Sequence, residues 1–241
     1  MIRVILFGAR GRMGQMVSAD LMKQSDISIL AGVERDGHTD INSTCDGLKI
    51  ITDSSQIPEA DVWIDFSLAE AATRHAEMAT KTNMHMIIGA TGFNNEQLQI
   101  LINASKYCPL LLGSNFSMGV GVMQHIVGIT SKWLKNDFDT TLSEQHHKKK
   151  LDKPSGTAKD LLKTIYKSSQ LTPQIASFRV GGAIGEHQVR FVGEHEELVI
   201  THRAFSREAF SQGVKIAIDY IVEQKNGFYS VSDIYSANLP E

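Results

Sequence analysis

Between Glu144 and Thr157 the chain gathers residue types that can bind anions and transfer protons. His146 and His147 are adjacent, and histidine titrates near neutral pH. Positive charge comes from four lysines, which are Lys148, Lys149, Lys150 and Lys153. Pro154 ends any extended segment and apolar residues recur at helical spacing after it, so we expect a helix to begin near Thr157. Because helix amino termini bind anions, this stretch predicts a site for a carboxylate or phosphate ligand.

The predicted start of that helix carries its own signal. Thr157 followed three residues later by Asp160 resembles a capping box. Ser155 and Gly156 would leave backbone N–H groups available at the positive end of the helix. The interpretation as an active site depends on this turn lying next to the histidines and lysines.

Three simpler interpretations of the histidine and lysine run compete with this one. Charged runs are often only solvated surface. A metal site is disfavoured, and no metal is expected, because adjacent histidines on a strand point to opposite faces and no Cys or nearby carboxylate cluster completes a ligand set. A nucleic-acid surface is disfavoured by the short run, its lack of aromatic residues and the formal net charge of -3.

A glycine-rich turn near the amino terminus predicts a second site, for a dinucleotide. The apolar run 2–7 indicates a strand, and apolar residues from 13 to 21 recur at helical spacing. The turn 8–14 between them has a glycine at every third position, so its backbone N–H groups could approach a pyrophosphate. The turn departs from the commonest G-x-G-x-x-G spacing, because two residues rather than one separate its first two glycines. The alternative interpretation is a strand, turn and helix that bind no ligand.

The next strand supports the dinucleotide interpretation. The run 27–33 ends at Glu34, twenty residues beyond Gly14, where a dinucleotide fold places an acid on the adenosine ribose. Arg35 follows, and a guanidinium could hold the 2′-phosphate of NADP. The expected cofactor is therefore NADH, NADPH or both. Its expected contacts in this region are Gly8, Ala9, Arg10, Gly11, Arg12, Met13, Glu34 and Arg35.

Strands and helices continue to alternate as far as residue 114. Apolar runs predict strands at 62–66, 84–89 and 110–112, and helical spacing predicts helices at 70–81 and 94–104. Such repeated units form a parallel sheet covered on both faces, with ligands at the carboxyl ends of the strands. Small or polar residues there suit a nicotinamide ring, although ordinary turn chemistry also explains them. They are Gly89, Ala90, Thr91, Gly113, Ser114, Asn115 and Phe116.

A different pattern begins at residue 115. It starts with a long amphipathic helix whose apolar face is expected to contain Val120, Met123, Ile126, Val127, Trp133 and Leu134. The β-rich runs that follow indicate an antiparallel or mixed sheet, with strands at 140–144, 175–180, 188–192 and 197–201. A helix and a strand near the carboxyl terminus are expected to return to the first domain, and they span 214–221 and 228–231.

These elements predict an α/β protein with two domains. The first is a Rossmann-like parallel sheet in residues 1–114, completed by 213–241, and it binds the dinucleotide. The second is an α+β domain in residues 115–212, with a mixed or antiparallel sheet, and it binds the substrate and mediates oligomerisation.

The composition is that of an ordinary globular protein, with 42% hydrophobic and 21% charged residues in 241. The two cysteines, Cys45 and Cys108, suggest reduced thiols rather than a disulfide framework. No apolar run is long enough to span a bilayer, and no room for a signal peptide precedes the first strand. We therefore expect a cytoplasmic location and no membrane or nucleic-acid partner.

Together these motifs resemble the 4-hydroxy-tetrahydrodipicolinate reductase family, also called dihydrodipicolinate reductase. The resemblance covers nearly the whole chain and includes the turn 8–14, Glu34-Arg35, 89–93 and 115–117. Its most specific motif is Glu144-x-His146-His147-x-x-Lys150-x-Asp152-x-Pro154-Ser155-Gly156-Thr157. The resemblance implies hydride transfer from NADH or NADPH to a small cyclic dicarboxylate, giving tetrahydrodipicolinate with loss of water, in lysine (diaminopimelate) biosynthesis.

The resemblance also implies roles for single residues. His146 would be the acid/base residue, and Lys150 a proton donor or charge partner beside it. The substrate carboxylates would be contacted by His147, Gly156 and Thr157. A homotetramer built through the sheet of the second domain is implied as well. Lys153 stands where the family usually has alanine, and it adds charge without an obvious role.

Two other functions stay open at this point. One is another two-domain NAD(P)H-dependent reductase, such as one acting on an aspartate-derived aldehyde. Enzymes of that kind that form a thioester need a catalytic Cys, and Cys108 lies at the edge of an apolar strand with no evident activation. The other is a nucleotide-sensing regulator that binds the dinucleotide without chemistry and uses the lysine run as a partner surface.

Overall fold

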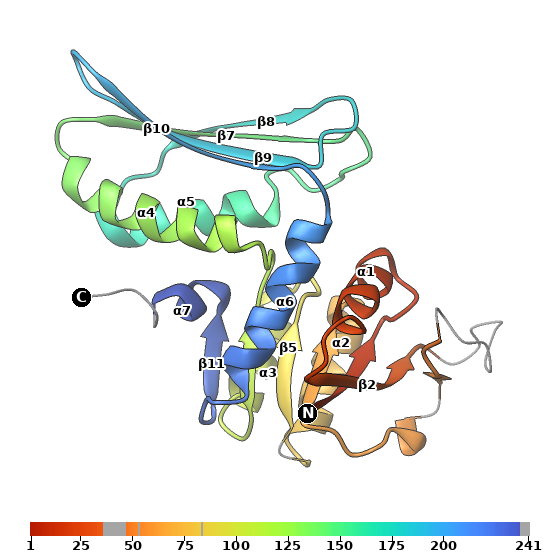
Figure 1. Cartoon of the computed structure of the whole chain (residues 1–241). Coiled ribbons are helices and arrows are strands. Elements are labelled where there is room, and N and C mark those ends of the chain that lie inside the picture. The colour runs from red at the N-terminus through yellow and green to blue at the C-terminus, as the bar shows by residue number, and fades with distance from the viewer. Residues whose placement is uncertain (36–46, 53, 83, 237–241) are drawn as a thin grey trace. The chain divides into compact units, whose positions relative to one another are not determined.

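The computed structural model describes residues 1–35, 47–52, 54–82 and 84–236, which form two compact units (Figure 1). The first unit consists of Met1–Phe116 and Ser211–Ile234. The second consists of Ser117–Phe210 and the described residues after Ile234. No helix of the described ranges is long and apolar enough to cross a membrane. Cys45 lies outside the described residues, while Cys108 is a buried free thiol whose pKa burial raises to about 11.

The first unit is built on a seven-stranded parallel sheet with the order β11-β6-β5-β4-β1-β2-β3. Its strands are β1 (Ile2–Phe7), β2 (Ile27–Val33), β3 (Ile50–Ile51), β4 (Val62–Asp65), β5 (His85–Ile88), β6 (Pro109–Leu112) and β11 (Gly227–Ser230). The predicted parallel sheet is confirmed. Strand β3 was not predicted, because a two-residue strand has no periodicity to detect.

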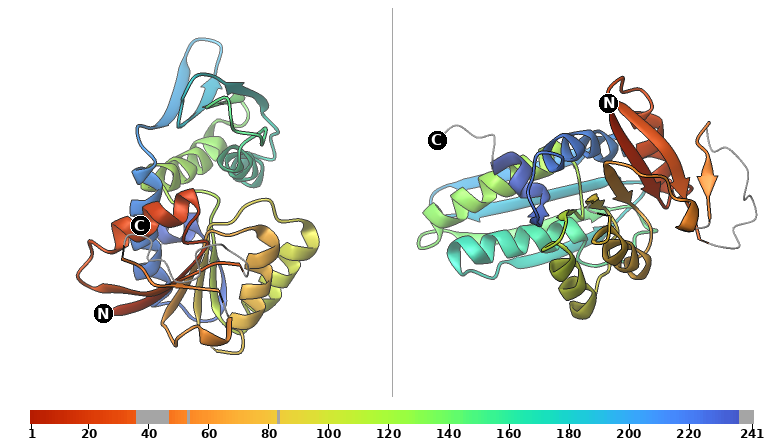
Figure 2. Two further views of the ribbon diagram at one scale, coloured as in Figure 1. Left: turned by 90° about the vertical axis from the view of Figure 1, so that its right-hand side faces the viewer. Right: turned by 90° about the horizontal axis from the view of Figure 1, so that it is seen from below.

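Helices cover both faces of this sheet (Figure 2). They are α1 (Arg12–Leu21), α2 (Ala69–Ala79), α3 (Asn95–Ala104) and α6 (Glu208–Ile221). Two short helices complete the list of elements, the 3-10 helix η1 (Ser54–Gln56) and α7 (Val231–Ser236), which begins directly after β11. Helices α2 and α3 bury their alanine and leucine faces against the sheet in the main core of the unit. Helix α6 lies beside α1, where Ser211 donates to Asp20.

The strand order reverses beside β1, which pairs with β2 on one side and with β4 on the other. Open parallel sheets bind ligands at the carboxyl ends of the strands where the order reverses. The segments at that point are the glycine turn after β1 and the turn Phe66–Ser67 after β4. The two turns touch, because a Cβ added at Gly8 would lie 2.9 Å from backbone atoms of both residues.

The second unit is a four-stranded sheet with two helices on one of its faces (Figure 1). Its elements are α4 (Met118–Leu134), β7 (Asp139–His146), α5 (Gly156–Ser169), β8 (Gln174–Arg179), β9 (Gly185–Val192) and β10 (Glu197–Ala204). The order is β10-β9-β7-β8, with β7 and β8 parallel and the other pairs antiparallel, so the predicted mixed sheet is confirmed. Its core holds Met123, Val127, Leu142, Ala158, Leu161, Ile165, Val189 and Phe191.

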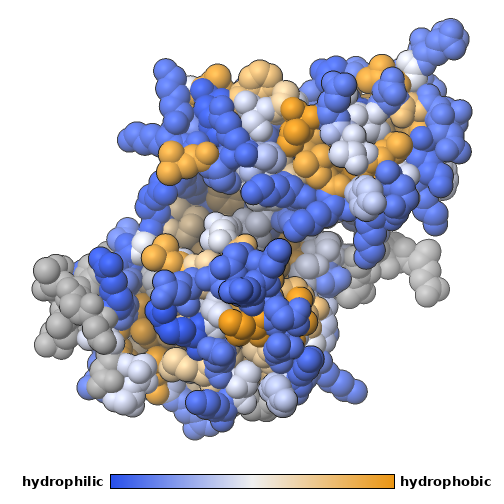
Figure 3. All heavy atoms as spheres, turned by 180° about the vertical axis from the view of Figure 1, so that it is seen from behind, coloured by the Kyte–Doolittle hydropathy of each residue, from blue (hydrophilic) through white to orange (hydrophobic). Residues whose placement is uncertain are grey.

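Helix α4 does not bury all of its predicted apolar face. Val120, Met123 and Val127 are buried, but Ile126 is exposed and Trp133 is 80% exposed. They continue a second apolar stripe on the exposed side of the helix, which also contains Met118, Val122 and Ile129. Helical spacing shows that residues share a stripe, but it cannot show which of two apolar stripes packs on the sheet. Figure 3 shows one face of the molecule, where apolar residues of the second unit lie among polar ones.

The structure divides the units after Phe116, Phe210 and Ile234, whereas the sequence placed the divisions after residues 114 and 212. Phe116 belongs to the first unit, because its ring packs edge-on against Phe66 and its carbonyl occupies the space where Gly213 lacks a Cβ. At the other end of the chain, Tyr235 groups with the second unit, because its ring fills the space over Gly121 of α4. These contacts link residues far apart in the sequence, so local patterns do not reveal them.

Candidate active site

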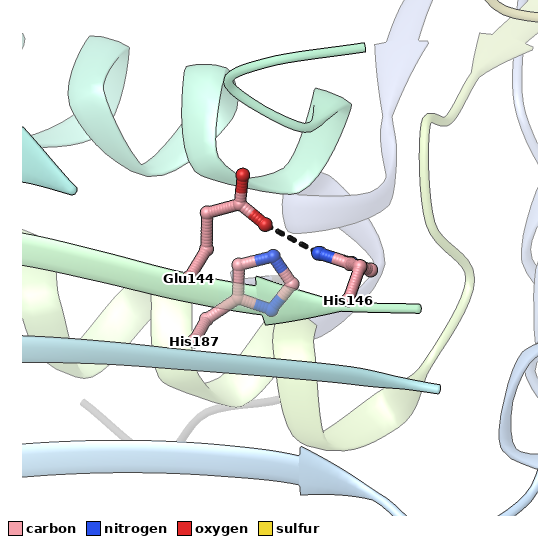
Figure 4. A group of neighbouring side chains, drawn as sticks. All are labelled: Glu144, His146 and His187. Carbon is pink, nitrogen blue, oxygen red and sulfur yellow. Dashed lines mark hydrogen bonds and ion pairs between the residues drawn. The ribbon is translucent and has the colours of Figure 1, made fainter. Parts of the chain in front are cut away.

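His146 is the last residue of β7 and is held there by a carboxylate on its own strand. Glu144 lies two residues earlier, so both side chains point to the same face of the sheet, and the Nδ1 atom of His146 bonds Glu144 Oε2 (Figure 4). Burial raises the pKa of Glu144, but hydrogen bonds from Arg179, Ser177 and His146 outweigh it and lower this pKa to about 2. Glu144 is therefore an ionised acceptor at neutral pH, although it is only 1% exposed.

The ionised carboxylate determines which nitrogen of His146 can exchange a proton. A carboxylate can only accept, so Nδ1 carries hydrogen and Nε2 keeps the lone pair of the neutral ring. Burial lowers the pKa of His146, and the charges of Lys150 and Arg179 lower it further against the effect of Glu144, so the ring is neutral at pH 7. A Cβ at Gly185 would lie 3.2 Å from Nε2, so any larger residue at position 185 would crowd that nitrogen.

A second buried histidine, His187, stands beside His146 and was not among the predicted site residues. It faces Glu144 across the β7–β9 pair, and its ring meets that of His146 edge-on at 5.2 Å. Its Nε2 lies 3.0 Å from Ser155 Oγ, while its buried Nδ1 has no hydrogen-bond partner in the described part of the chain. Burial, followed by the charge of His146, lowers its pKa to about 3. His187 is therefore a neutral ring that supports Ser155.

Ser155, not Thr157, caps helix α5. Its Oγ accepts the backbone N–H of Ala158 at 3.2 Å, and the helix begins at Gly156. The predicted start of the helix is confirmed, but the capping box of Thr157 and Asp160 is wrong, because Thr157 is already a buried residue of the first turn. Serine and threonine are both good caps, so the sequence could not separate positions two residues apart.

The loop after β7 carries the lysines. It begins at His147, whereas His146 still belongs to the strand. Lys150 Nζ pairs with Asp152 Oδ1 at 2.9 Å. His147 leaves the strand, and its Nε2 lies 3.4 Å from a guanidinium nitrogen of Arg207. The two rings thus have different partners, because β7 ends at His146 and His147 belongs to the following loop. Lys153 is exposed.

The sequence-based argument against a metal site, that no carboxylate lies near the histidines, is wrong. The ligand atoms of Glu144, His146 and His187 all lie within 4.8 Å of one another, so a carboxylate does stand near the histidines (Figure 4). Both carboxylate oxygens of Glu144, however, accept hydrogen bonds from the guanidinium of Arg179. A cation already neutralises this carboxylate, so we interpret the cluster as a hydrogen-bonded proton site.

The glycine turn of the first unit has the features of a dinucleotide site. A Cβ at Gly14 would lie 2.1 Å from the carbonyl oxygen of Gly8, so only glycine permits this close turn. Helix α1 begins after Gly11 with no side-chain cap and no acidic residue in its first turn, so its positive end suits a pyrophosphate. Glu34 directly follows the neighbouring strand β2, and its Oε1 accepts the backbone N–H of Arg10 at 2.7 Å.

The remaining predicted cofactor contacts lie at the carboxyl ends of β5 and β6, on the same edge of the sheet. The group comprises Gly89, Ala90, Thr91, Gly113, Ser114, Asn115 and Phe116, of which Thr91 and Ser114 are exposed. Sequence reasoning missed a buried pair at the same edge: Asp65 Oδ2 lies 2.6 Å from His75 Nδ1, and its Oδ1 accepts from Ser67. These bonds fix the turn after β4.

Comparisons with known proteins agree on one family. The family models "Dihydrodipicolinate reductase, N-terminus" and "Dihydrodipicolinate reductase, C-terminus" match residues 2–116 and 119–235. The 4-hydroxy-tetrahydrodipicolinate reductase of Psychrobacter arcticus is 32% identical, with 99% of this chain and 96% of the relative covered. That of Syntrophobacter fumaroxidans is 33% identical, with 97% and 98% covered. A dipicolinate-bound dihydrodipicolinate reductase from Paenisporosarcina sp. TG-14 has the same fold, with TM-score 0.82, 24% identity and 97% and 99% coverage.

Replacing His187 with Gln should flatten the pH dependence of stability in acid. Its folded pKa of about 3 lies below the ordinary value of 6.5, so between these values the unfolded chain binds one more proton than the folded chain. This group therefore makes the free energy of unfolding rise with pH by about 1.4 kcal/mol per pH unit in that window. Denaturant unfolding at intervals across the window measures the slope.

The matched control is His195→Gln, because His195 is exposed in the same unit, and its slope should equal that of the unmodified protein. If His187→Gln also keeps the original slope, His187 does not titrate as a buried neutral ring.

Proposed function

The chain belongs to the dihydrodipicolinate reductase family, and from this premise we propose how its residues carry out the reaction. It is an NAD(P)H-dependent oxidoreductase that reduces 4-hydroxy-tetrahydrodipicolinate to tetrahydrodipicolinate in lysine biosynthesis. Family membership decides against the two alternatives, another two-domain reductase and a nucleotide-sensing regulator. The observation that best supports the residue roles is the buried Glu144–His146 pair close to Ser155 and the start of α5.

The bound nicotinamide supplies a hydride, and the balance of the reaction then needs one proton and releases one water. We assign the proton transfer to His146, whose Nε2 is the nitrogen with the exchangeable lone pair. Lys150 is proposed to supply protons and positive charge to this ring, because its charge already acts on the pKa of His146 and its ammonium pairs with Asp152 at 2.9 Å. The neutral ring takes up a proton at Nε2, from the Lys150 ammonium or from water, and passes that proton to the substrate.

The substrate is proposed to bind through its carboxylates. Gly156 and Thr157 lie in the first turn of α5, where backbone N–H groups and the helix dipole favour anions. His147 is proposed as a third contact, and Arg207 beside it adds positive charge. The dicarboxylate class of the substrate fits these groups, because they are cations and N–H donors.

Substituting His146 with Gln, or Lys150 with Ala, tests the catalytic roles. Each change should lower kcat by roughly a hundredfold or more, because general acid/base catalysis is lost. NADH affinity should stay the same, since the proposed dinucleotide contacts belong to the other unit. A spectrophotometric assay with freshly generated substrate measures kcat, and fluorescence titration measures NADH binding.

Lys167→Ala is a suitable control, because Lys167 is an exposed lysine in the last turn of α5. Normal turnover in both site variants would contradict the proposed roles, and loss of turnover in the control would show that the helix, not the side chain, had been disturbed.

The choice between NADH and NADPH is proposed to depend on Glu34 and Arg35. Glu34→Ala should lower kcat/KM for NADH by roughly ten- to hundredfold, because a charged hydrogen bond to the ribose diol is lost. Arg35→Ala should weaken NADPH use and leave NADH use unchanged, because the 2′-phosphate loses its cation. The measurement is kcat/KM with NADH and with NADPH for the unmodified protein and the two variants. The same NADH-to-NADPH ratio of kcat/KM in all three proteins would contradict the assignment.

We also propose that the chain forms a homotetramer through the open face of the four-stranded sheet. Helices α4 and α5 pack on one face, and the other face exposes Phe178, Val192 and Val199 among polar side chains. Apolar side chains on an uncovered sheet face are typical of an association surface. A cytoplasmic location stays a prediction.

Light scattering should therefore give four times the chain mass of 26.6 kDa. Phe178→Glu should reduce the mass, because it places a charge in the proposed contact, whereas Tyr166→Glu on the exposed side of α5 should not. A single-chain mass for the unmodified protein would exclude the tetramer.

A further inference from the structure

Arg179, the last residue of β8, uses every donor of its side chain within the candidate site. Its Nε donates to the carbonyl of Lys150 at 3.2 Å, and its two terminal nitrogens donate to Glu144 Oε2 at 3.0 Å and Oε1 at 2.9 Å. The two remaining N–H groups reach the carbonyls of Phe178, at 2.7 Å, and Asp152. A guanidinium has five N–H donors, so all of them are matched, and the side chain is only 8% exposed.

These bonds connect the two groups to which proton transfer is assigned. On one side Arg179 fixes the carboxylate of Glu144, which in turn orients the ring of His146. On the other side it fixes two carbonyls of the loop that carries Lys150. Leu151, Asp152 and Lys153 in this loop are exposed, so packing against the core does not hold them and the two bonds from Arg179 tie this part of the loop to β8.

We propose that Arg179 is a positioning residue that sets the orientation of His146 and the place of Lys150 through one guanidinium. This deepens the proposed function and depends on it. Lysine cannot replace arginine here, because an ammonium has three donors and no planar fork to match a carboxylate and two carbonyls at once.

Arg179 also acts on the charge balance at His146. The charged and titratable groups around this ring are Glu144 on β7, Arg179 on β8, His187 on β9 and Lys150 in the loop. Arg179 neutralises Glu144, so the carboxylate attracts a proton to the Glu144–His146 pair less strongly. Without the guanidinium charge, the pair should take up a proton at higher pH.

Two substitutions separate the geometric role of Arg179 from the electrostatic one. Arg179→Gln removes the charge and most donors, so kcat should fall about a hundredfold and the His146 titration should move to higher pH. Arg179→Lys keeps the charge, so the titration should stay near its original pH while kcat still falls. Selective 13C labelling of histidine, with the His146→Gln spectrum for assignment, follows the titration by NMR, and the pH profile of kcat/KM follows it kinetically.

Arg3→Gln is the matched control, because Arg3 makes a similar two-oxygen pair with Asp61 at the surface of the other unit. It should keep both kcat and the titration. Full activity in Arg179→Lys, or an unmoved titration in Arg179→Gln, would overturn the proposal. If circular dichroism shows that Arg179→Gln does not fold, the kcat of Arg179→Lys decides whether Arg179 is a positioning residue.

The NMR titration does not require turnover, so it tests the positioning role separately from the reaction. Absence of reductase activity in the unmodified protein would instead contradict the proposed function and leave the titration result standing.

Discussion

An ionised carboxylate buried between a guanidinium and an imidazole is the interaction on which the geometry of the candidate site depends. Removing a carboxylate from water costs several kcal/mol, and only well-placed charges and donors offset this cost. Glu144 receives both terminal nitrogens of Arg179 and the Nδ1 of His146. Because these partners come from β7 and β8, the charge requires the two strands to align in register, with His146 beside Arg179.

The same carboxylate explains why His146 suits acid/base chemistry. A buried histidine alone would stay neutral far below pH 7, as His187 does. Glu144 opposes the effect of burial at His146, while Lys150 and Arg179 act with it. The balance of these charges leaves His146 less perturbed than its neighbour, although the two rings meet edge-on.

Local patterns in the sequence predicted most of the fold and the contiguous part of the site. The alternating strands and helices of the first unit follow from apolar runs and helical spacing, which neighbouring residues determine. The predicted residues from His146 to Thr157 lie in one segment, so a motif could identify them together. Glu34 was expected after β2, and it does lie there, against the backbone of the glycine turn.

The site residues that the sequence did not predict are brought to His146 by pairing between distant segments. Arg179 and His187 lie 33 and 41 residues after His146, and only the register of β7 with β8 and β9 brings them to it. Neither residue stands in a recognisable motif. Two other features were missed because the sequence offered two suitable candidates for each. In α4 either apolar stripe could have packed on the sheet, and in α5 either Ser155 or Thr157 could have capped the helix.

The strands of the second unit divide stability and chemistry between their two ends. On the face under the helices, β9 carries Phe191 and Val189 and then His187 and Gly185, while β7 carries Leu142 and then Glu144 and His146. The apolar end packs against α4 and α5 and supplies the core. Continuing that apolar row to the ends of the strands would cost no desolvation of charge, and replacing buried ion pairs with apolar residues often leaves stability unchanged or raises it. The polar end is therefore better explained by what Glu144, His146 and Arg179 do for proton transfer than by what they contribute to folding.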